Sequence, residues 1–451
     1  MGRLFGTDGV RGIANEALTA ERAMQIGRAA AYVLSSKRRN VPKILIGMDT
    51  RLSSDMLANA LSAGLCSVGA DVVWLGVVPT PAVAYLVGKY KATAGIMISA
   101  SHNPYEFNGI KIFNEDGLKL ADEIEERIES IVLDSKPSVS LADSKNIGRV
   151  TFAKNAVDDY IEHITSAAIC SLEGMEIAID CANGSASVSA RKLFEELGAR
   201  VHVLYDEPDG MNINDGCGST HLEKLREYVL ENKLACGVAF DGDADRCLCV
   251  DDKGEVIDGD FILAICALDL KERGKLRRNT VVGTIMTNFG FTKFCEKNGI
   301  NFIPTKVGDR YVLEEMLLEG YSLGGEQSGH VIFRDHATTG DGQLTAVELL
   351  THLKRSGVAL SELASVMTRY PQYMVNIRTT DEGKLAFYTD HEIKALLRHA
   401  EEELADTGRI VVRPSGTEPL IRIMTEGEDA ELAERVANET AEAIKQKLST
   451  Y

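Results

Sequence analysis

The sequence predicts an α/β protein of three similar domains followed by a smaller C-terminal α+β domain. Three segments of the 451-residue chain, 43–75, 176–204 and 279–303, share one order of elements: a buried strand, a polar loop, a helix that ends at glycine, and a second strand. This order implies parallel strands joined by a right-handed crossover. Because no G-x-G-x-x-G motif opens any of the helices, three domains are favoured over one long dinucleotide-binding sheet.

The end of the chain has a different pattern. Strands are expected near 375–379, 409–413 and 421–427, and a helix with apolar residues at helical spacing is expected over 430–448. Strands grouped with a single long helix indicate a small α+β domain. A chain of this length exceeds one ordinary core, so four domains agree with its size.

Composition excludes several classes of protein. Apolar residues make up 45% of the chain and charged residues 26%, as in soluble globular proteins. No stretch approaches the about 20 apolar residues that cross a bilayer, and the N-terminus lacks the apolar core of a signal peptide. The nine cysteines include no C-x-x-C pair, which favours the cytoplasm and disfavours a zinc site. A net charge of −18 makes nucleic acid and anionic membranes poor partners, whereas a small anionic substrate would require a local cationic cluster.

A loop of small residues, Ser99-Ala-Ser101-His102-Asn103-Pro104, connects the apolar runs 95–98 and 110–113. Small residues let the loop approach a ligand closely, and Pro104 blocks continuation as a helix. Ser101 is expected just beyond the end of a strand, where its hydroxyl can act as a nucleophile or a phosphate carrier. Taken alone, the loop is more often an ordinary polar turn.

Three aspartates alternate in Asp241-Gly-Asp243-Ala-Asp245-Arg246, between two strand-like segments. Carboxylates spaced in this way converge on one hard cation, for which oxygen ligands favour Mg²⁺ or Ca²⁺. An EF-hand is excluded, because it requires glycine where Arg246 stands and a helix on each side. A metal-free acidic turn is the alternative, and mutual repulsion makes it costly.

The glycine-framed loop 324–330 contains a carboxylate, a hydroxyl and an imidazole, in Glu326, Ser328 and His330. This set suits hydrogen bonds to sugar hydroxyls or to an amine, and His330 could take or give a proton. Without the other motifs, a polar turn is an equally good interpretation.

A local cationic cluster occurs in Arg413-Pro-Ser415-Gly416-Thr417-Glu418-Pro419, followed by Arg422. Two guanidinium groups, two hydroxyls and the amides around Gly416 favour a phosphate, although surface arginines beside a proline-bounded loop are the simpler alternative. Arg11, in a glycine-rich loop, and Lys111, on the strand that leaves the Ser101 loop, would each neutralise charge on a transferring phosphoryl group. Lys111 could also serve as a base. The segment 306–310 could add anion contacts, but a polar turn is the favoured interpretation.

Five motifs together resemble those of the α-D-phosphohexomutases, in their order and spacing over nearly the whole chain. They are TDGVRG (7–12), ISASHNP (98–104), DGDADR (241–246), GEQSGH (325–330) and RPSGTEP (413–419). The N-terminal FGTDGVRG, the segment 210–221 and GEQSGH are most similar to the bacterial branch that acts on glucosamine phosphate. The sequence departs slightly from the pattern at 105–107 and at Ala244, where glycine is also common.

The resemblance implies four domains with mixed sheets in the first three, arranged around a central cleft. The implied segments are 1–150 with the phosphoserine loop, 151–255 with the metal-binding loop, 256–370 with the sugar-recognition loop and 371–451 with the phosphate-binding loop. The implied catalytic residues are Ser101, as a phosphoserine, Arg11, Lys111 and His330. The implied Mg²⁺ ligands are phosphorylated Ser101, Asp241, Asp243 and Asp245. The implied substrate-binding residues are Arg246, Glu326, Ser328, Arg413, Ser415, Gly416, Thr417 and Arg422.

The implied activity is the reversible conversion of glucosamine 6-phosphate into glucosamine 1-phosphate, which would supply amino-sugar nucleotide and cell-wall precursor synthesis. Glucosamine 1,6-bisphosphate, or glucose 1,6-bisphosphate, would serve as intermediate and activator. A homodimer is expected only because relatives often form one. Three alternatives stay open: a mutase for glucose or mannose phosphate, a metal-dependent phosphatase that uses Ser101, and a sugar-phosphate sensor without turnover.

Overall fold

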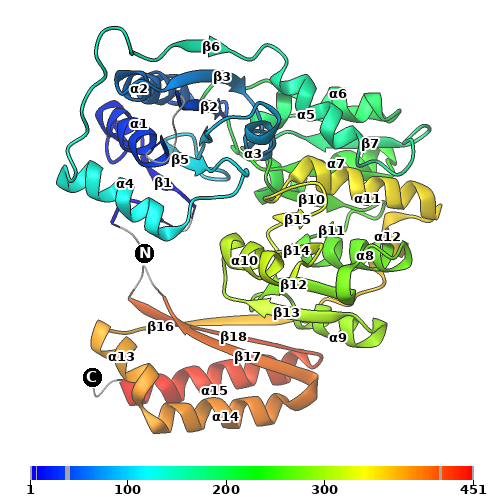
Figure 1. Cartoon of the computed structure of the whole chain (residues 1–451). Coiled ribbons are helices and arrows are strands. Elements are labelled where there is room, and N and C mark those ends of the chain that lie inside the picture. Colours follow the sequence, from blue (N-terminus) through cyan, green and yellow to red (C-terminus); the bar gives the residue numbers. More distant parts are fainter. Residues whose placement is uncertain (1–2, 7, 36–40, 416–418, 449–451) are drawn as a thin grey trace. The chain divides into compact units, whose positions relative to one another are not determined.

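The computed structural model describes residues 3–6, 8–35, 41–415 and 419–448. The chain divides into two compact units (Figure 1). The first unit contains Met1–Thr284 and Ile303–Ser365, and the second contains Ile285–Phe302 and Val366–Tyr451.

The first sheet of the first unit has the strand order β1-β5-β4-β2-β3-β6 and is mixed. Its strands are β1 (Val10–Ile13), β2 (Lys43–Met48), β3 (Asp71–Val77), β4 (Ala94–Ile98), β5 (Phe107–Phe113) and β6 (Val150–Phe152). The strands from β4 to β6 in this order run parallel, whereas β5 is antiparallel to both β4 and β1. The helices of this region are α1 (Ala20–Ser35), α2 (Ser54–Ser67), α3 (Thr80–Lys89) and α4 (Asp122–Asp134).

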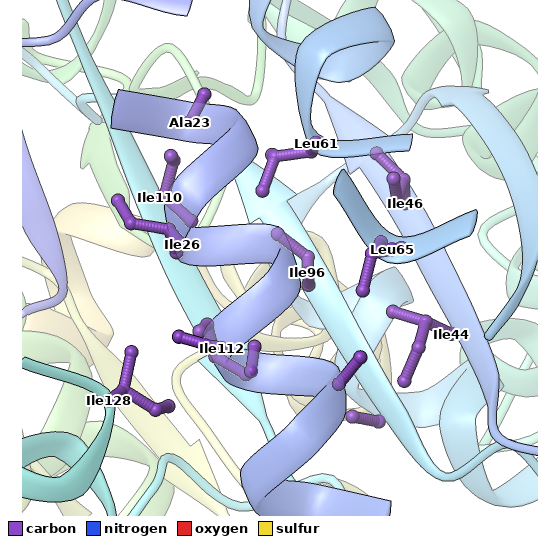
Figure 2. Close-up of a cluster of buried hydrophobic side chains, with 14 of the residues drawn as sticks. Ala23, Ile26, Ile44, Ile46, Leu61, Leu65, Ile96, Ile110, Ile112 and Ile128 are labelled. Carbon is purple, nitrogen blue, oxygen red and sulfur yellow. The ribbon is translucent and has the colours of Figure 1, made fainter. Parts of the chain in front are cut away.

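Aliphatic side chains of this sheet pack against α1, α2 and α4, and Figure 2 shows Ile26 of α1 beside Ile96 and Ile110 of the sheet. The two helices α1 and α2 approach closely because glycines face each other's backbone. A Cβ atom at Gly64 would lie 2.2 Å from the carbonyl oxygen of Met24, and one at Gly27 would lie 2.7 Å from that of Leu61. The packed helices hold the sheet whose strand ends carry the Ser101 loop.

The second sheet of this unit has the order β11-β10-β9-β7-β8, and the third has the order β13-β12-β14-β15. The elements of the second region are α5 (Ala156–Thr165), β7 (Glu176–Asp180), α6 (Ala190–Glu196), β8 (Arg200–Leu204), α7 (Glu223–Asn232), β9 (Cys236–Phe240), β10 (Cys247–Val250) and β11 (Val256–Ile257). Those of the third are α8 (Gly259–Glu272), β12 (Thr280–Thr284), β13 (Asn301–Thr305), α10 (Asp309–Glu319), β14 (Leu323–Gly325), β15 (Val331–Phe333), α11 (Gly342–Ser356) and α12 (Leu360–Ala364). Both sheets are mixed, because β10 is antiparallel to β9 and β15 is antiparallel to β14.

The second unit contains an antiparallel sheet of order β16-β18-β17. Its elements are α9 (Phe289–Asn298), β16 (Gln372–Arg378), α13 (Asp381–Thr389), α14 (His391–Leu404), β17 (Gly408–Pro414), β18 (Leu420–Gly427) and α15 (Ala430–Leu448). Glu426 of β18 accepts a hydrogen bond from the backbone N–H of Phe289 at 3.0 Å and forms a buried ion pair with Arg409 at 2.7 Å. These contacts fasten the start of α9 to the C-terminal sheet.

The predicted fold class, α/β with mixed sheets and a smaller α+β part, is confirmed. The predicted segment 43–75 folds as β2-α2-β3 and 176–204 as β7-α6-β8, and both strand pairs are parallel as expected. The third segment folds as β12-α9-β13, but its helix belongs to the second unit. Among the described residues, no helix is both long and apolar enough to span a membrane.

Candidate functional site

Ser101 lies three residues beyond the end of β4, on a loop that turns back into β5. Its φ of +54° is in the left-handed region, where non-glycine residues are uncommon, and the side chain of Ser99 stabilises this turn by accepting the N–H of Ser101 at 2.9 Å. Ser101 is buried, with 1% of its surface exposed, and its Oγ donates to Oδ2 of Asp241 at 2.5 Å. The loop therefore presents the hydroxyl to the aspartate motif rather than to solvent.

A buried guanidinium holds this loop in place. The side chain of Arg51 has no exposed surface and forms an ion pair with Asp49 at 2.7 Å. It donates to the carbonyl oxygens of Ser101 at 2.8 Å, Asn103 at 2.9 Å and Phe107 at 3.0 Å, and also to that of Pro104. Sequence reasoning missed Arg51, although a charged Asp49-Thr-Arg51 directly after a buried strand was a signal that could have found it.

Asp241, Asp243 and Asp245 lie in the turn between β9 and β10, where Ala244 has a φ of +56°, which explains why glycine is also common there. All three aspartates are buried, and one carboxylate oxygen from each lies within 4.8 Å of the others. Burial, and then repulsion from Asp245 and Asp243, raises the pKa of Asp241 well above its usual value. Such a trio is unstable without a counter-charge.

The geometry fits a hard divalent cation. Oδ1 of Asp243 and Oδ1 of Asp245 are buried and have no hydrogen-bond partner among the described residues. Their other oxygens are occupied: Oδ2 of Asp243 accepts from Thr80 at 2.5 Å and from Lys111 at 2.8 Å. Two buried orphan carboxylate oxygens beside Asp241 form an oxygen donor set, which suits Mg²⁺ or a similar ion. Sequence reasoning missed Thr80.

Lys111 lies among three carboxylates, with its Nζ 2.8 Å from Asp243, 3.0 Å from Asp8 and 3.3 Å from Asp245. Burial alone would lower its pKa, but the charges of Asp243, Asp8 and Asp245 outweigh it and raise the pKa well above its usual value. Lys111 is therefore a cation, which favours its predicted role in charge neutralisation over that of a base. Arg11 pairs with Asp8 at 2.5 Å.

Two more residues near Ser101 were missed by sequence reasoning. Nδ1 of His102 lies 3.4 Å from Oγ of Ser101, and burial, followed by the charges of Arg246 and Arg11, lowers the pKa of His102 to about 4. Asp8 binds both Lys111 and Lys119, and although burial opposes its charge, these cations lower its pKa well below the usual value.

The loop that bears Glu326, Ser328 and His330 is joined to the metal loop by backbone contacts. The N–H of Cys247, the first residue after the aspartate motif, donates to the carbonyl of Gly329 at 3.0 Å. Gly329 has a φ of +89°, and a Cβ atom there would lie 2.3 Å from the carbonyl oxygen of Cys247. Only glycine permits this approach, and it fixes the position of Glu326 relative to the aspartates.

The metal loop and the loop of Glu326 line part of an open cavity of about 660 Å³. Its lining residues are Leu4, Phe5, Gly6, Asp8, Gly9, Arg11, Asp245, Arg246, Val307, Gly308, Asp309, Glu326, Ser328 and His330. The ring nitrogens of His330 and the Nε atoms of Arg11 and Arg246 are buried without a hydrogen-bond partner among the described residues. Unpaired donors on two guanidiniums and an imidazole suit an anionic, hydroxyl-rich ligand.

The first unit thus brings together ten of the predicted site residues: Arg11, Ser101, Lys111, Asp241, Asp243, Asp245, Arg246, Glu326, Ser328 and His330. Arg413, Ser415 and Arg422 belong to the second unit. Gly416 and Thr417 lie outside the described residues.

In the second unit, Arg413 of β17 and Arg422 of β18 are direct cross-strand partners. Two positively charged side chains therefore lie at directly opposite positions of the strand pair. Lys384 of α13, which sequence reasoning missed, donates to the carbonyl of Ser415 at 2.8 Å, so a third cation lies beside the loop. Three cationic side chains, on Arg413, Arg422 and Lys384, are thus grouped in this part of the second unit, and guanidinium groups are favourable partners of phosphate.

Four family profiles match the chain in sequence order. They describe phosphoglucomutase/phosphomannomutase α/β/α domain I at residues 2–138, domain II at 158–254, domain III at 258–370 and the C-terminal domain at 374–443. Their limits differ somewhat from the predicted segments 1–150, 151–255, 256–370 and 371–451, which stay a prediction.

Curated relatives match along the full chain. The phosphoglucosamine mutase of Acetivibrio thermocellus is 54% identical over 448 residues, which are 99% of this chain and 100% of that protein. That of Clostridium novyi is 53% identical over 447 residues, 99% of each chain.

Solved structures share the fold at lower identity. A phosphoglucomutase/phosphomannomutase family protein from Burkholderia thailandensis superposes with a TM-score of 0.83 at 23% identity and covers 97% of both chains. The N-acetylphosphoglucosamine mutase of Aspergillus fumigatus, solved in complex with GlcNAc-6P and magnesium, has a TM-score of 0.68 at 17% identity and covers 99% of this chain and 96% of that one.

Proposed function

The chain belongs to the phosphoglucomutase/phosphomannomutase family, and on that premise we propose that it reversibly converts glucosamine 6-phosphate into glucosamine 1-phosphate. Full-length relatives named phosphoglucosamine mutase, at 54% and 53% identity, support glucosamine over other sugars. The observation that carries the proposal is the contact of Ser101 Oγ with Asp241 inside a buried trio of aspartates.

Ser101 acts as a phosphoryl carrier. In the first half-reaction, O1 of glucosamine 6-phosphate attacks the phosphorus of phospho-Ser101. The bond from phosphorus to Oγ breaks as the bond to O1 forms. O1 loses its proton to a base, Oγ takes up a proton as it leaves, and glucosamine 1,6-bisphosphate results. The bisphosphate then turns over. In the second half-reaction, Oγ of Ser101 loses its proton to a base as it attacks the 6-phosphoryl group. The bond from phosphorus to O6 breaks, O6 takes up a proton, and glucosamine 1-phosphate leaves.

Asp241, Asp243 and Asp245 would hold a divalent cation, Mg²⁺ in our proposal, together with an oxygen of the Ser101 phosphate. The orphan Oδ1 atoms of Asp243 and Asp245 support this assignment. When bound, the cation supplies neutralisation of charge on the phosphoryl oxygens. Lys111 and Arg11 add fixed positive charge beside it, so that the chain mainly positions and stabilises the transferring group.

The two ends of the substrate need separate recognition. Glu326 and Ser328 would bind sugar hydroxyls or the amine, and Arg246 and His330 would donate to the ligand in the same cavity. Arg413, Ser415, Gly416, Thr417 and Arg422 would hold the phosphate that does not react. Because the bisphosphate turns over, this clamp must accept either phosphate in turn.

We further propose that the protein works in the cytoplasm, that its product supplies amino-sugar nucleotide and cell-wall precursor synthesis, and that it forms a homodimer. The four segments 1–150, 151–255, 256–370 and 371–451 would carry the phosphoserine, metal, sugar and phosphate loops respectively.

One assay tests the proposed function. Purified wild type and Ser101→Ala are incubated with Mg²⁺, a trace of glucose 1,6-bisphosphate, and the 6-phosphates of glucosamine, glucose or mannose. We expect isomerisation by the wild type, fastest with glucosamine phosphate, and its loss in the variant. Isomerisation that survives in Ser101→Ala would contradict the carrier role. Release of inorganic phosphate without an isomer would indicate a phosphatase, and faster turnover of mannose phosphate would overturn the substrate assignment.

A further inference from the structure

Two consecutive residues at the start of α10 bind oppositely charged groups near the start of α4. Asp309 pairs with Lys119. Arg310 pairs with Asp122, binds Glu125 at 3.1 Å and donates to the carbonyl oxygen of Leu120 at 2.7 Å. We call these five side chains, Lys119, Asp122, Glu125, Asp309 and Arg310, the latch.

The latch differs from ordinary surface ion pairs, which contribute little because water screens them. The side chains of Lys119, Glu125, Asp309 and Arg310 are between 13% and 17% exposed, whereas that of Asp122 is 72% exposed. The contacts of Asp309 with Lys119 and of Arg310 with Glu125 are therefore the shielded ones. Burial opposes the charge of Lys119, but Asp309 and Asp8 outweigh it and raise its pKa, while Lys119 lowers the pKa of Asp309. Asp309 and Arg310 are adjacent and carry opposite charges. If the loop shifted by one residue, like charges would face each other, so the ion pairs can form in one register only.

One end of the latch reaches the phosphoryl-transfer residues. Nζ of Lys119 lies 2.5 Å from Oδ1 of Asp8, and Oδ2 of Asp8 lies 3.0 Å from Nζ of Lys111. Lys111 in turn binds Asp243 of the metal loop. An alternating series of charges therefore runs from the metal loop to Lys119.

The other end reaches the groups that face the sugar. Gly308, which precedes the latch, donates its N–H to Oε1 of Glu326 at 3.2 Å. Oδ2 of Asp309 lies 3.5 Å from Nε2 of His330. Glu326, His330, Gly308 and Asp309 all line the cavity of about 660 Å³.

We propose that Lys119 and Arg310 are positioning residues, which fix the loop 306–310 so that Glu326 and His330 are set at the correct place relative to Ser101. This inference rests on the proposed function, because it assigns the latch to recognition of the sugar ring of the same substrate. Arg310 contacts none of the proposed catalytic groups in the described chain, so its effect must pass through the loop.

The first test needs no activity. Amide hydrogen exchange is measured on the full-length, unliganded wild type and on Arg310→Met, in peptides that cover 305–312 and 324–331. We expect exchange at least about tenfold faster in both regions of the variant, because the loop and its contact with Glu326 loosen together. If both peptides of Arg310→Met exchange at the same rates as those of the wild type, the latch does not fix the loop and the proposal is wrong.

The second test separates positioning from general damage. In Arg310→Met, KM for glucosamine 6-phosphate should rise about tenfold with kcat changed much less, because binding of the ring is lost in ground and transition states alike. Glu125→Gln should raise KM less, and the double variant should be no worse than Arg310→Met alone. Additive effects of the two substitutions, or a fall in kcat at unchanged KM, would contradict the proposal.

Arg278→Met is the matched control, because Arg278 pairs with Glu319 at the opposite end of α10 with 62% and 48% of the two side chains exposed. It should leave both exchange and KM unchanged. If the wild type does not isomerise sugar phosphates, the proposed function is wrong. The hydrogen-exchange result then decides by itself whether the latch fixes the loop.

Discussion

The hydroxyl of Ser101 and the carboxylate of Asp241 form a hydrogen bond of 2.5 Å although 140 residues separate them in the chain. Each lies in a loop directly after a buried strand, and the two strands belong to different sheets of the first unit. The contact joins a hydroxyl that can carry a phosphoryl group to a cluster that can hold a cation. Of the four predictions that follow, the first two test groups beside this contact, the third tests a buried carboxyl of the first unit, and the fourth tests the phosphate loop of the second unit.

Thr80 should set the affinity of the metal site. Its hydroxyl donates to Oδ2 of Asp243 at 2.5 Å and leaves Oδ1 available for a cation. Thr80→Val should weaken Mn²⁺ binding by about 10- to 100-fold, as loss of a hydrogen bond to a metal ligand does elsewhere, whereas Thr80→Ser should bind normally. Electron paramagnetic resonance of free Mn²⁺ measures this. The control Thr351→Val removes a helix hydroxyl that binds the carbonyl of Val347, and equal weakening there would refute the role of Thr80.

Arg51 should be essential for the stability of the Ser101 loop. Arg51→Met leaves the buried carboxylate of Asp49 without its ion-pair partner and removes the guanidinium from the loop carbonyls, so that Ser101 and Asn103 keep only the side-chain donor of Asn214. Breaking a fully buried ion pair costs about 3–5 kcal/mol, so the urea midpoint of the first unfolding transition should fall markedly. Arg191→Met removes a half-exposed arginine and should cost less than about 1 kcal/mol. Similar losses of stability in Arg51→Met and Arg191→Met would contradict the role of Arg51 in holding the Ser101 loop.

Glu348 should make stability fall as pH rises. Burial raises its pKa to about 7, despite the opposing charge of Arg273. Between its ordinary pKa and about 7, the folded chain holds a proton that the unfolded chain has lost, so the free energy of unfolding decreases as pH increases. Glu348→Gln removes this dependence, and the difference from wild type should change by up to about 1.4 kcal/mol per pH unit across that range.

Urea unfolding at a series of pH values measures the effect of Glu348. The control is Glu272→Gln, because the side chain of Glu272 is 77% exposed. Stability curves of wild type and Glu348→Gln that stay parallel from about pH 5 to about pH 7, roughly the range between the ordinary and the raised pKa, would show that the pKa of Glu348 is not raised.

Arg413 should bind the phosphate that does not react. Arg413→Met in a Ser101→Ala background should weaken the binding of glucosamine 6-phosphate by about tenfold or more, since a guanidinium–phosphate contact is lost. Isothermal titration calorimetry measures binding there without turnover. Arg398→Met, on the exposed face of α14, is the control. Binding that is unchanged by Arg413→Met would remove this loop from the phosphate site.

The chemistry-bearing loops could be predicted because each is a short polar motif after a buried apolar strand. Ser101 follows β4 and Asp241 follows β9, and both strands are recognisable from their apolar residues. Glu326 follows β14, whose residues Gly324 and Gly325 were expected in the loop, so this motif was found from its polar residues alone. Parallel pairing in the first two repeated segments followed from the same pattern.

The supporting residues could not be predicted in the same way. The charged residues Asp49 and Arg51 after a buried strand mark a candidate site, but the backbone carbonyls that Arg51 binds leave no mark in the sequence. Thr80 stands in an ordinary helix start 163 residues from Asp243. Lys119 and Asp309 are 190 residues apart, and the sequence around each of them predicts only a polar turn. Their roles depend on which domains meet, and that information is absent from local patterns.

The claim that Ser101 carries and returns the phosphoryl group is tested most directly by following the label from one turnover. Protein phosphorylated on Ser101 with ³²P is mixed with an excess of unlabelled glucosamine 6-phosphate, and the products are separated. We predict that the label moves to position 1 of the sugar, as glucosamine 1-phosphate or the 1,6-bisphosphate, while Ser101 regains an unlabelled phosphoryl group. Label retained on Ser101 while glucosamine 1-phosphate forms, or label released as inorganic phosphate, would contradict the account.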